Sequence, residues 1–468
     1  MLGKTRRVHF VGIGGIGMSG IAELLANLGY AVSGSDARRS DVTARLEQAF
    51  GVTIFEGHQA SHVGDAEVVV ISSAVRAGNA EVAAARERGI PVIPRAEMLA
   101  ELMRLRFSIA IAGSHGKTST TSMIALVLER GGLDPTAVIG GRLSAFGSNA
   151  RLGRGEYMVA EADESDRSFL LLWPSIAVMT NIDHEHMESY GSLADLQQAF
   201  VDFANKVPFY GAAVACVEDE NLAAILPRIK RKVVTYGLDH PRAQIVGTDV
   251  ELGAFGGRCL VHRQNPREAM KLLGRLELTV PGRHNLQNAL AAVAVGQSIG
   301  LDFARVADAL AGFQGAERRF ERYGEAGGVL VVDDYGHHPT EIAAVMSAAR
   351  ATFDRRLIVA FQPHRYSRTA QLLDAFGPAL AGADEIVLTD IYAAGEDPLP
   401  GITIERLAES IRIGSGRPVH VVKALKDVVR ELLAIIRPGD VVITLGAGSI
   451  GTLPAPLVQA LKQKGSAH

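Results

Sequence analysis

Residues 107–119 read FSIAIAGSHGKTS, a short apolar run that leads into a glycine-rich turn and the first residues of an amphipathic helix. The pattern predicts a strand over 107–112 and a helix that ends at Gly131-Gly132. Between a strand and a helix, the backbone N–H groups and the helix N-terminus form a cradle for an anion. Lys117 is placed to reach the β- and γ-phosphates of a nucleotide, and the Thr118 hydroxyl is placed to bind Mg²⁺.

This turn is shorter than the full P-loop consensus, because Ile111 occupies the place of the first glycine and Gly113 comes two residues later. The alternative interpretation is a plain glycine-rich connection without a ligand. The sequence Gly-Lys-Thr between a strand and a helix favours nucleotide phosphate binding over that alternative.

Two acidic segments follow further apolar runs and are candidates for the metal that a nucleotide brings. The first, MVAEADESD at 158–166, contains four acids, of which Glu161 stands at the predicted end of its strand. The second, NIDHEH at 181–186, combines two acids with two histidines, which suit either a transition metal or an existing Mg²⁺ site. A solvated acidic loop is the alternative, but open α/β sheets bind ligands at such strand ends.

A second glycine-rich turn, Gly12-x-Gly14-x-x-Gly17, lies between a predicted strand over 8–11 and a predicted helix over 19–28. Asp36 ends the next predicted strand, about twenty residues further on, as in dinucleotide-binding folds. A nicotinamide-dependent oxidoreductase is therefore one hypothesis. That hypothesis does not explain the other glycine-rich turn, at 113–119. A chain with one site for a nucleotide-diphosphate compound and another for ATP explains both turns.

Strands and helices alternate along nearly the whole chain, which is typical of α/β folds with mostly parallel sheets. We predict three domains: 1–106, Rossmann-like; 107–317, P-loop ATPase-like; and 318–468, also Rossmann-like. The predicted strands of the third domain are 329–333, 356–361, 385–389 and 441–445.

The composition of the 468 residues excludes several classes of protein. With 47% hydrophobic and 21% charged residues the chain is globular and not disordered, and a net charge of −3 argues against broad nucleic-acid binding. Two cysteines, Cys216 and Cys259, are too few for a disulfide framework or a cysteine zinc site. Without an apolar run of membrane-spanning length, we expect a cytoplasmic protein without membrane insertion.

The combined motifs resemble those of the Mur ligases over nearly the whole chain. One such string is weak evidence, but all of them in this order are specific. They are HFVGIGGIGMSGIA (9–22), SGSD (33–36), SSAV (72–75), PRAEMLAELM (94–103), GSHGKTS (113–119), EADESD (161–166), NIDHEHM (181–187), VDFANKVPFYG (201–211), RRFE (318–321), DDYGHHPTEI (333–342) and QPHRYSRT (362–369).

The resemblance is strongest to the branch of the family that adds L-alanine to UDP-N-acetylmuramate in peptidoglycan precursor synthesis. It implies that ATP, with Mg²⁺, phosphorylates the lactyl carboxylate and that the amino group of alanine attacks the acyl phosphate. The first domain would bind the UDP substrate, the second ATP, and the third would close onto the ATP site, with hinges near Arg106 and Gly315. Alternatives are a Mur-type ligase for another amino acid or acceptor, and a nucleotide-binding relative without activity. The sequence does not give the oligomeric state, and a homodimer is one possibility.

The resemblance also assigns residues by motif. The UDP substrate would contact Gly12, Gly14, Gly15, Ile16, Gly17, Ser35, Asp36 and Ser73. ATP would contact Gly113, Ser114, His115, Gly116, Lys117, Thr118, Ser119, Asn288, Arg319 and Asp334, with His284 and Asn285 as neighbouring candidates. Mg²⁺ would bind Thr118, Glu161 and His186, and the muramoyl and alanine groups would face Tyr335, His337, His338, His364, Arg365 and Arg368. The catalytic set would be Lys117, Glu161, His186, Arg319, His338 and His364, in which the general base stays open.

Two departures from the family pattern are Ser114, where threonine is common, and Arg167, where a small residue is usual. Arg167 would either add a charge near the lactyl or phosphate site or point to solvent. Residues 191–205 contain no lysine, in agreement with the alanine-adding branch, which lacks the carbamylated lysine of several relatives.

Overall fold

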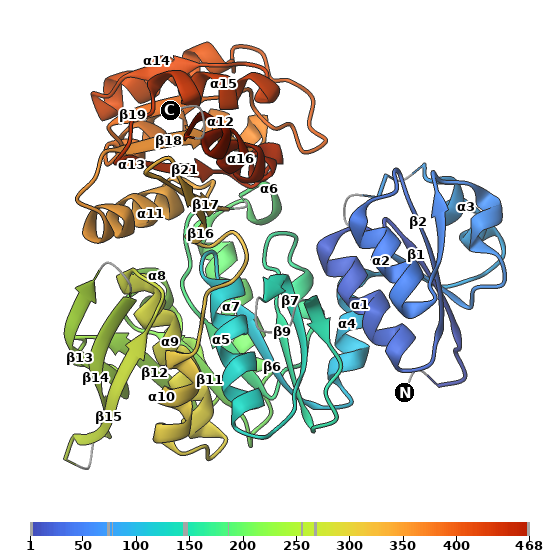
Figure 1. The fold of residues 1–468 in the computed structure, drawn as a ribbon. Helices are drawn as coiled ribbons and strands as arrows, with labels where there is room; N and C mark the ends of the chain where they lie inside the picture. Colours follow the sequence, from blue (N-terminus) through green and yellow to red (C-terminus); the bar gives the residue numbers. More distant parts are fainter. Residues whose placement is uncertain are drawn as a thin grey trace. The chain divides into compact units, whose positions relative to one another are not determined.

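A computed structural model describes residues 3–72, 75–76, 78–143, 148–185, 187–253, 256–265 and 269–465. Within these residues the strands form three sheets of five, ten and six strands, covered by helices (Figure 1), and the predicted α/β class is confirmed. By its contacts the chain divides into two compact units. The first holds Met1–Val250, Arg258–Glu277 and Leu286–Gln314, and the second holds Glu251–Gly257, Leu278–Asn285 and Gly315–His468.

Each predicted domain contains one sheet core, but the predicted boundaries at 106 and 317 stay predictions. The last segment of the second unit begins at Gly315, near which one hinge is expected. Arg106, near which the other hinge is expected, lies inside the first unit. Among the described residues, no helix combines the length and the apolar character needed to cross a bilayer.

The first sheet is entirely parallel, and its order places a ligand crevice beside the central strand. Across the sheet the strands are β3 (Thr53–Glu56), β2 (Ala31–Asp36), β1 (Arg7–Val11), β4 (Val68–Ile71) and β5 (Val92–Pro94). The helices are α1 (Ile16–Asn27), α2 (Asp41–Phe50), α3 (Ala80–Glu87) and α4 (Arg95–Met103). Strands β2 and β3 lie on one side of β1, and β4 and β5 lie on the other. The strand order therefore reverses between β1 and β4, at the end of β1 where the first glycine loop begins.

The second sheet has the same kind of reversal at β6 (Phe107–Ala112). Both neighbours, β9 (Tyr157–Glu161) and β10 (Ile176–Met179), run parallel to β6. The strands on the β10 side are β11 (Ala212–Cys216), β12 (Val233–Leu238), β13 (Ile245–Gly253), β14 (Gly256–Arg263) and β15 (Lys271–Leu278), and those on the β9 side are β7 (Thr136–Leu143) and β8 (Ser148–Arg151).

Helix α5 (Lys117–Arg130) is buried along nearly its whole length against this sheet and α10 (Phe303–Ala311) (Figure 1). Its apolar residues from Met123 to Leu128 are at most 2% exposed. A helix that is buried on all sides is held rigidly by packing. The loop at 113–116 therefore joins two tightly packed elements, β6 and α5.

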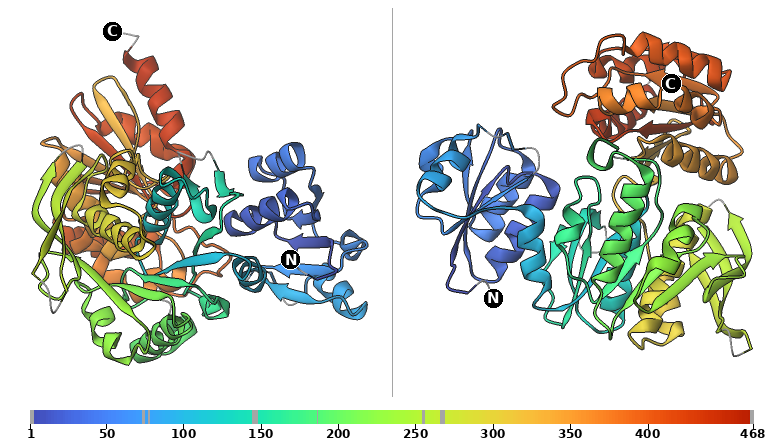
Figure 2. Two further views of the ribbon diagram at one scale, coloured as in Figure 1. Left: turned by 90° about the horizontal axis from the view of Figure 1, so that it is seen from below. Right: turned by 180° about the vertical axis from the view of Figure 1, so that it is seen from behind.

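The third sheet lies in the second unit and is parallel except for its first strand. In order it contains β16 (Glu321–Ala326), β17 (Val329–Asp334), β21 (Val441–Leu445), β18 (Leu357–Phe361), β19 (Glu385–Leu388) and β20 (Val419–Val421). Helices cover the third sheet (Figures 1 and 2). One buried apolar layer contains residues of α11 (Pro339–Thr352) and α14 (Ile404–Ser415), and a second contains residues of α15 (Leu425–Ile435) and α16 (Pro454–Gly465).

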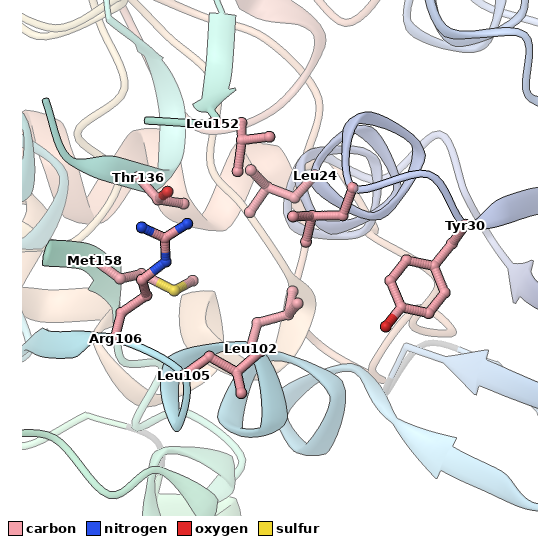
Figure 3. Close-up of a pocket in the computed structure, with 9 residues that line it drawn as sticks. Leu24, Tyr30, Leu102, Leu105, Arg106, Thr136, Leu152 and Met158 are labelled. Atoms are coloured by element: carbon pink, nitrogen blue, oxygen red, sulfur yellow. The ribbon is translucent and has the colours of Figure 1, made fainter. Parts of the chain in front are cut away.

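A cavity of about 320 Å³ lies in the first unit, where leucines of α1 and α4 meet β7 and β9 (Figure 3). Arg106, Thr136 and Met158 line it, at the amino ends of the parallel strands β6, β7 and β9. The Arg106 guanidinium donates to the carbonyl oxygen of Gly155. Because the phosphate loop leaves the opposite end of β6, this cavity is separate from the predicted nucleotide site.

Candidate functional site

The three segments that the sequence singled out in the central domain come together at one edge of the second sheet. Strand β6 lies between β9 and β10, with Ile111 opposite Glu161 and Ala112 opposite Met179. The phosphate loop therefore lies between the acidic segment after β9 and the Asn181 segment after β10. This is the crevice at the carboxyl ends of the strands, at the point where their order reverses.

The phosphate loop has a conformation that only glycine fits at two positions. Gly113 has φ +143°, and a Cβ atom there would lie 1.9 Å from the Thr180 hydroxyl oxygen. Gly116 has φ +80°, and its Cβ would lie 2.9 Å from Asn288 Oδ1. The side chains of Thr180 and Asn288 thus close the loop from two sides, and Asn288 lies beside the loop as the predicted adenine contact requires.

The segment after β10 fixes the backbone of the loop by hydrogen bonds. The His115 N–H donates to Asn181 Oδ1 at 2.8 Å, and the His115 carbonyl accepts from the Thr180 hydroxyl at 2.7 Å. The Asp183 N–H donates to the Ser114 hydroxyl at 2.8 Å. These bonds preorganise the loop for a ligand, as anion-binding turns require.

Lys117 lies over the loop, with its ammonium group 2.5 Å from the Gly113 carbonyl oxygen and 3.2 Å from that of Ser114. Its third partner is Glu164 Oε1 at 2.8 Å. Burial disfavours the charge of Lys117, but the carboxylates of Glu164 and Asp163 outweigh that effect and raise its pKa. The lysine therefore keeps its positive charge at neutral pH at the place where phosphate oxygens are expected.

Glu164 was not selected from the sequence, although it lies in the quoted acidic string. Its side chain is 1% exposed, and burial raises its pKa to about 7 against the opposing attraction of Lys117. Glu161, the predicted metal ligand, is partly exposed at the end of β9. In the structure Glu164 pairs with Lys117, whereas Glu161 lies at the end of strand β9. Only the three-dimensional arrangement distinguishes them.

Asp183 and Glu185 are the described acids of the second segment. His115 Nε2 lies 2.8 Å from Asp183 Oδ2, which orients the ring of the loop histidine. Glu185 is buried, and its charge contributes to the raised pKa of Lys117. His186, the predicted metal-binding histidine, lies outside the described residues.

Thr118 and Ser119 are the second and third residues of helix α5, after Lys117, and are 9% and 7% exposed. Thr118 therefore lies in the first turn of the helix that follows the loop, where the metal and phosphate roles were predicted. Those roles remain predictions.

Arg167, whose role the sequence left open, is part of the packing around the acidic segment. Its guanidinium forms two hydrogen bonds to Asp195, at 2.7 and 3.1 Å, and lies 4.9 Å from the centre of the Tyr190 ring. The Tyr190 hydroxyl donates to the carbonyl oxygen of Glu164. Arg167 is thus held by an ion pair that supports Tyr190 and, through it, the backbone of Glu164.

The first glycine loop is folded against the end of strand β2. Gly12 has φ +81°, and the N–H groups of Gly12 and Ile13 donate to the Ser35 carbonyl oxygen at 2.8 and 3.0 Å. The Gly14 N–H donates to Asp36 Oδ2 at 2.8 Å.

The other residues predicted to bind the UDP group differ in their surroundings. Gly15 is exposed, while a Cβ at Gly17 would lie 2.4 Å from Arg95 Nη1, so glycine allows close packing of α1 on α4. The Ser35 hydroxyl is buried and donates to Glu81 Oε2 at 2.6 Å. The Ile16 side chain and Ser73 lie outside the described residues.

The second unit brings together a ring cluster at the carboxyl ends of β17 and β18. The rings of His337 and His364 lie 5.4 Å apart, and His364 stacks on Tyr392 at 5.6 Å. Arg368 Nη1 lies 3.4 Å from His364 Nδ1. Tyr392 was not predicted, because it follows β19 and is brought to His364 by the tertiary fold.

Two guanidinium carbons lie over the Tyr335 ring, that of Arg318 at 5.2 Å and that of Arg319 at 5.3 Å from its centre. Arg318 is fixed by Asp333 and by the Gly446 carbonyl, both at 2.7 Å, so its role is structural. The Arg319 guanidinium lies 3.6 Å from Glu341, and its side chain is 28% exposed, against 20% for Arg318; its contact to phosphate stays a prediction.

Asp334, predicted to bind the ATP ribose, is 5% exposed and accepts the N–H groups of Gly336 at 2.6 Å and Phe320 at 2.7 Å. It thereby organises the backbone around the tyrosine. Burial raises its pKa to about 6.

The remaining predicted residues lie at helix starts or beside them in the second unit. His338 is buried at the N-terminus of α11, where its ring nitrogen accepts from the Thr340 N–H at 3.4 Å. Arg365 is exposed and precedes α12 (Tyr366–Gln371). His284 and Asn285 also belong to this unit, and burial, followed by the charge of Arg319, lowers the pKa of His284 to about 4.

We expect His364 to stay neutral well below pH 7. Burial, followed by the charges of Arg368 and Arg365, lowers its pKa from 6.5 to about 4. Between pH 6.5 and 4 the unfolded state therefore binds more protons, so the free energy of unfolding falls as the pH is lowered through this window. A histidine NMR titration, assigned with His364→Asn, should give a midpoint near 4 for His364, and this variant should lose stability less steeply on acidification. A midpoint above 6 would contradict the buried environment.

Comparison with protein families gives matches along nearly the whole chain. The model for the Mur ligase family, catalytic domain, matches residues 7–107. The Mur ligase middle domain matches residues 111–296, and the Mur ligase, glutamate ligase domain, matches residues 318–448. The three matches cover the three sheets described above.

Individual relatives agree with these matches. The chain is 52% identical over 463 residues to the UDP-N-acetylmuramate–L-alanine ligase of Geobacter sp., with 99% of each chain covered. It is 52% identical over 462 residues to the enzyme of that name from Myxococcus xanthus, with 98% and 96% covered.

Solved structures are similar over comparable lengths. The crystal structure of the UDP-N-acetylmuramate–alanine ligase of Thermotoga maritima has a TM-score of 0.82 at 30% identity and covers 98% of this chain and 99% of that one. A murein peptide ligase from Psychrobacter arcticus has a TM-score of 0.74 at 25% identity, with 97% and 98% covered.

Proposed function

Because the chain belongs to the Mur ligase family, we infer that it joins L-alanine to the lactyl carboxylate of UDP-N-acetylmuramate in peptidoglycan precursor synthesis. The observation that carries this inference is the match, at 52% identity over 99% of both chains, to a relative named for that reaction. An inactive relative is less well supported, since the loop keeps its lysine and glycines, and the lysine pairs with Glu164.

ATP is the proposed energy source, and the loop after β6 is its proposed site. The two glycines of this loop lie where any Cβ would strike Thr180 or Asn288, so only glycine keeps the loop conformation. Successive backbone N–H groups in such a turn are proposed to bind the phosphates. Lys117 supplies a positive charge at the same place. Asn288 closes the loop on the side where adenine is proposed to bind.

Mg²⁺ fits the oxygen donors beside this loop. Thr118 lies in the first turn of α5, and Glu161 ends the neighbouring strand β9, opposite Ile111 in the register. A hydroxyl and a carboxylate are ligands that Mg²⁺ prefers, together with substrate phosphates. When bound, the ion would neutralise negative charge on the phosphate oxygens. His186 stays a proposed further ligand.

The reaction needs positioning and charge more than a protein nucleophile. A lactyl carboxylate oxygen attacks the γ-phosphorus of ATP and the bond to the β–γ bridging oxygen breaks, which releases ADP. The alanine nitrogen then attacks the acyl carbon, and the carbon–oxygen bond to phosphate breaks. Lys117 and Arg319 are proposed to stabilise the phosphoryl charge.

The residues of the second unit are proposed to bind alanine. Arginine suits a carboxylate, and Arg368 and Arg365 flank His364 in the ring cluster. Because its pKa is lowered to about 4, His364 is neutral at pH 7 and can accept a hydrogen bond from the amine, although a base of this pKa is weak. His338 and His337 remain alternatives for that role.

A product assay tests the proposed function. The protein is incubated with ATP, Mg²⁺, UDP-N-acetylmuramate and a panel of L-alanine, glycine and L-serine, and the products are identified by mass spectrometry. We expect UDP-N-acetylmuramoyl-L-alanine, with weaker activity on the neighbours, because a small pocket discriminates by about 1–3 kcal/mol per methylene. Absence of every ligated product, combined with nicotinamide-dependent reduction of the UDP sugar, would favour the oxidoreductase hypothesis.

The proposal includes a cytoplasmic location, where ATP and nucleotide sugars are available, and small-molecule partners in place of nucleic acid or membrane. Cys216 and Cys259 are buried free thiols, as is ordinary in a reducing compartment.

A homodimer also belongs to the proposal. Phe209 is 91% exposed and Tyr210 beside it is 65% exposed, which is unusual for large aromatic side chains and favours an interface. Sedimentation over a range of concentrations tests this. A monomer at every concentration would discard the dimer without affecting the ligase.

A further inference from the structure

Glu81 is a fully buried carboxylate that no part of the proposed reaction uses. It lies in the first turn of α3, where the Asn79 side chain accepts the N–H groups of Glu81 and Val82. Its side chain is 0% exposed. A buried charge is costly unless it is paired and hydrogen-bonded, so such a residue in a small domain calls for an explanation.

Four side chains from different elements surround this carboxylate. The Ser35 hydroxyl donates to Oε2 at 2.6 Å, His58 Nδ1 lies 3.2 Å from Oε2, and His62 Nδ1 lies 3.0 Å from Oε1. His9 Nε2 lies 3.9 Å from Oε1. Burial opposes ionisation, but the contacts with His9, Ser35 and His58 outweigh it and lower the pKa of Glu81 to about 2. The carboxylate is therefore charged at neutral pH.

Ser35 connects this cluster to the first glycine loop. Its hydroxyl donates a hydrogen bond to the Glu81 carboxylate, while its carbonyl oxygen accepts hydrogen bonds from the N–H groups of Gly12 and Ile13. The next residue, Asp36, accepts the Gly14 N–H. The two residues that accept hydrogen bonds from the glycine loop, Ser35 and Asp36, are thus the last two residues of β2. Glu81 contacts the first of them. A loop must be held within a fraction of an ångström to bind a ligand productively.

We propose that Glu81 is a positioning residue for the UDP substrate, acting through Ser35 to hold the end of β2 beneath the glycine loop. The inference rests on the proposed function, because it takes the UDP group as the ligand of this loop. Glu81 itself touches neither substrate nor ATP. Ser35 donates to its carboxylate, and His58 and His62 lie within hydrogen-bond distance, which offsets the cost of a charge in the interior.

The test is direct binding of UDP-N-acetylmuramate, measured by calorimetry on the full chain, with steady-state kinetics alongside. Glu81→Gln is expected to bind the UDP compound about tenfold more weakly, the fold-change of losing one hydrogen bond to a charged group. Its KM for UDP-N-acetylmuramate should rise while kcat and the KM for ATP stay near wild type. General destabilisation would instead lower kcat and leave every KM unchanged.

The matched control is Glu87→Gln, an exposed glutamate on the same helix α3, which should bind as wild type does. If Glu81→Gln does not fold, Glu81→Asp keeps the charge but withdraws the carboxylate from Ser35, and it should weaken binding in the same direction. Unchanged binding by a folded Glu81→Gln or Glu81→Asp protein would overturn the inference and leave the proposed function intact. Failure of the wild-type protein to bind the UDP compound would overturn both.

Discussion

Replacement of Lys117 by methionine is expected to lower kcat by about a thousandfold, because it removes the positive charge that lies over the phosphate loop. In the structure the ammonium group is held by two loop carbonyls and Glu164, so it is positioned before any chemistry occurs. The measurement is phosphate release under saturating substrates.

Two controls accompany this variant. Lys232→Met removes an exposed lysine at another edge of the same sheet and should leave kcat unchanged. Because Lys117→Met removes the ion pair of a buried Glu164 carboxylate, thermal unfolding must confirm that the variant is folded at the assay temperature. A folded Lys117→Met protein with kcat within tenfold of wild type would exclude the assigned role.

Gly113→Ala should lower the affinity for ATP by about a hundredfold or more, because the loop cannot keep its conformation. The new Cβ would lie 1.9 Å from the Thr180 hydroxyl oxygen, at a backbone φ of +143° that other residues rarely adopt. Displacement of Thr180 would also remove its hydrogen bond to the His115 carbonyl. Binding of a fluorescent ATP analogue measures the effect.

Gly132→Ala is the matched control for this substitution. Gly132 follows the other end of α5, also has a positive φ of +80°, and has open space around it. The control should cost about 1 kcal/mol of stability and leave ATP affinity unchanged. Equal ATP affinity in Gly113→Ala and wild type would show that the phosphate loop lies elsewhere.

Features that depend on local sequence were predicted well. The strand over 107–112 agrees with β6, the helix ending before Gly131 agrees with α5, and the strands before Asp36 and Glu161 lie where the apolar runs placed them. These elements combine an apolar period with glycine turns, and both signals are contained in a few consecutive residues.

Features that depend on the meeting of distant segments were not predicted. Glu164 and Glu161 stand three residues apart in one acidic string, and only the fold shows which of them pairs with Lys117. Tyr392 joins the ring cluster from another strand end, and Glu81 gathers histidines from three elements. Strands β13 to β15 were also missed, since β15 and much of β13 are exposed and lack a clear apolar alternation.

The most direct test of the account follows one oxygen atom. UDP-N-acetylmuramate labelled with ¹⁸O in its lactyl carboxylate is incubated with the protein, ATP, Mg²⁺ and L-alanine, and the released phosphate is examined by mass spectrometry. Ligation through an acyl phosphate predicts that each phosphate carries one labelled oxygen and that release requires both UDP-N-acetylmuramate and L-alanine. Unlabelled phosphate, or no phosphate from folded protein, would contradict the proposed reaction.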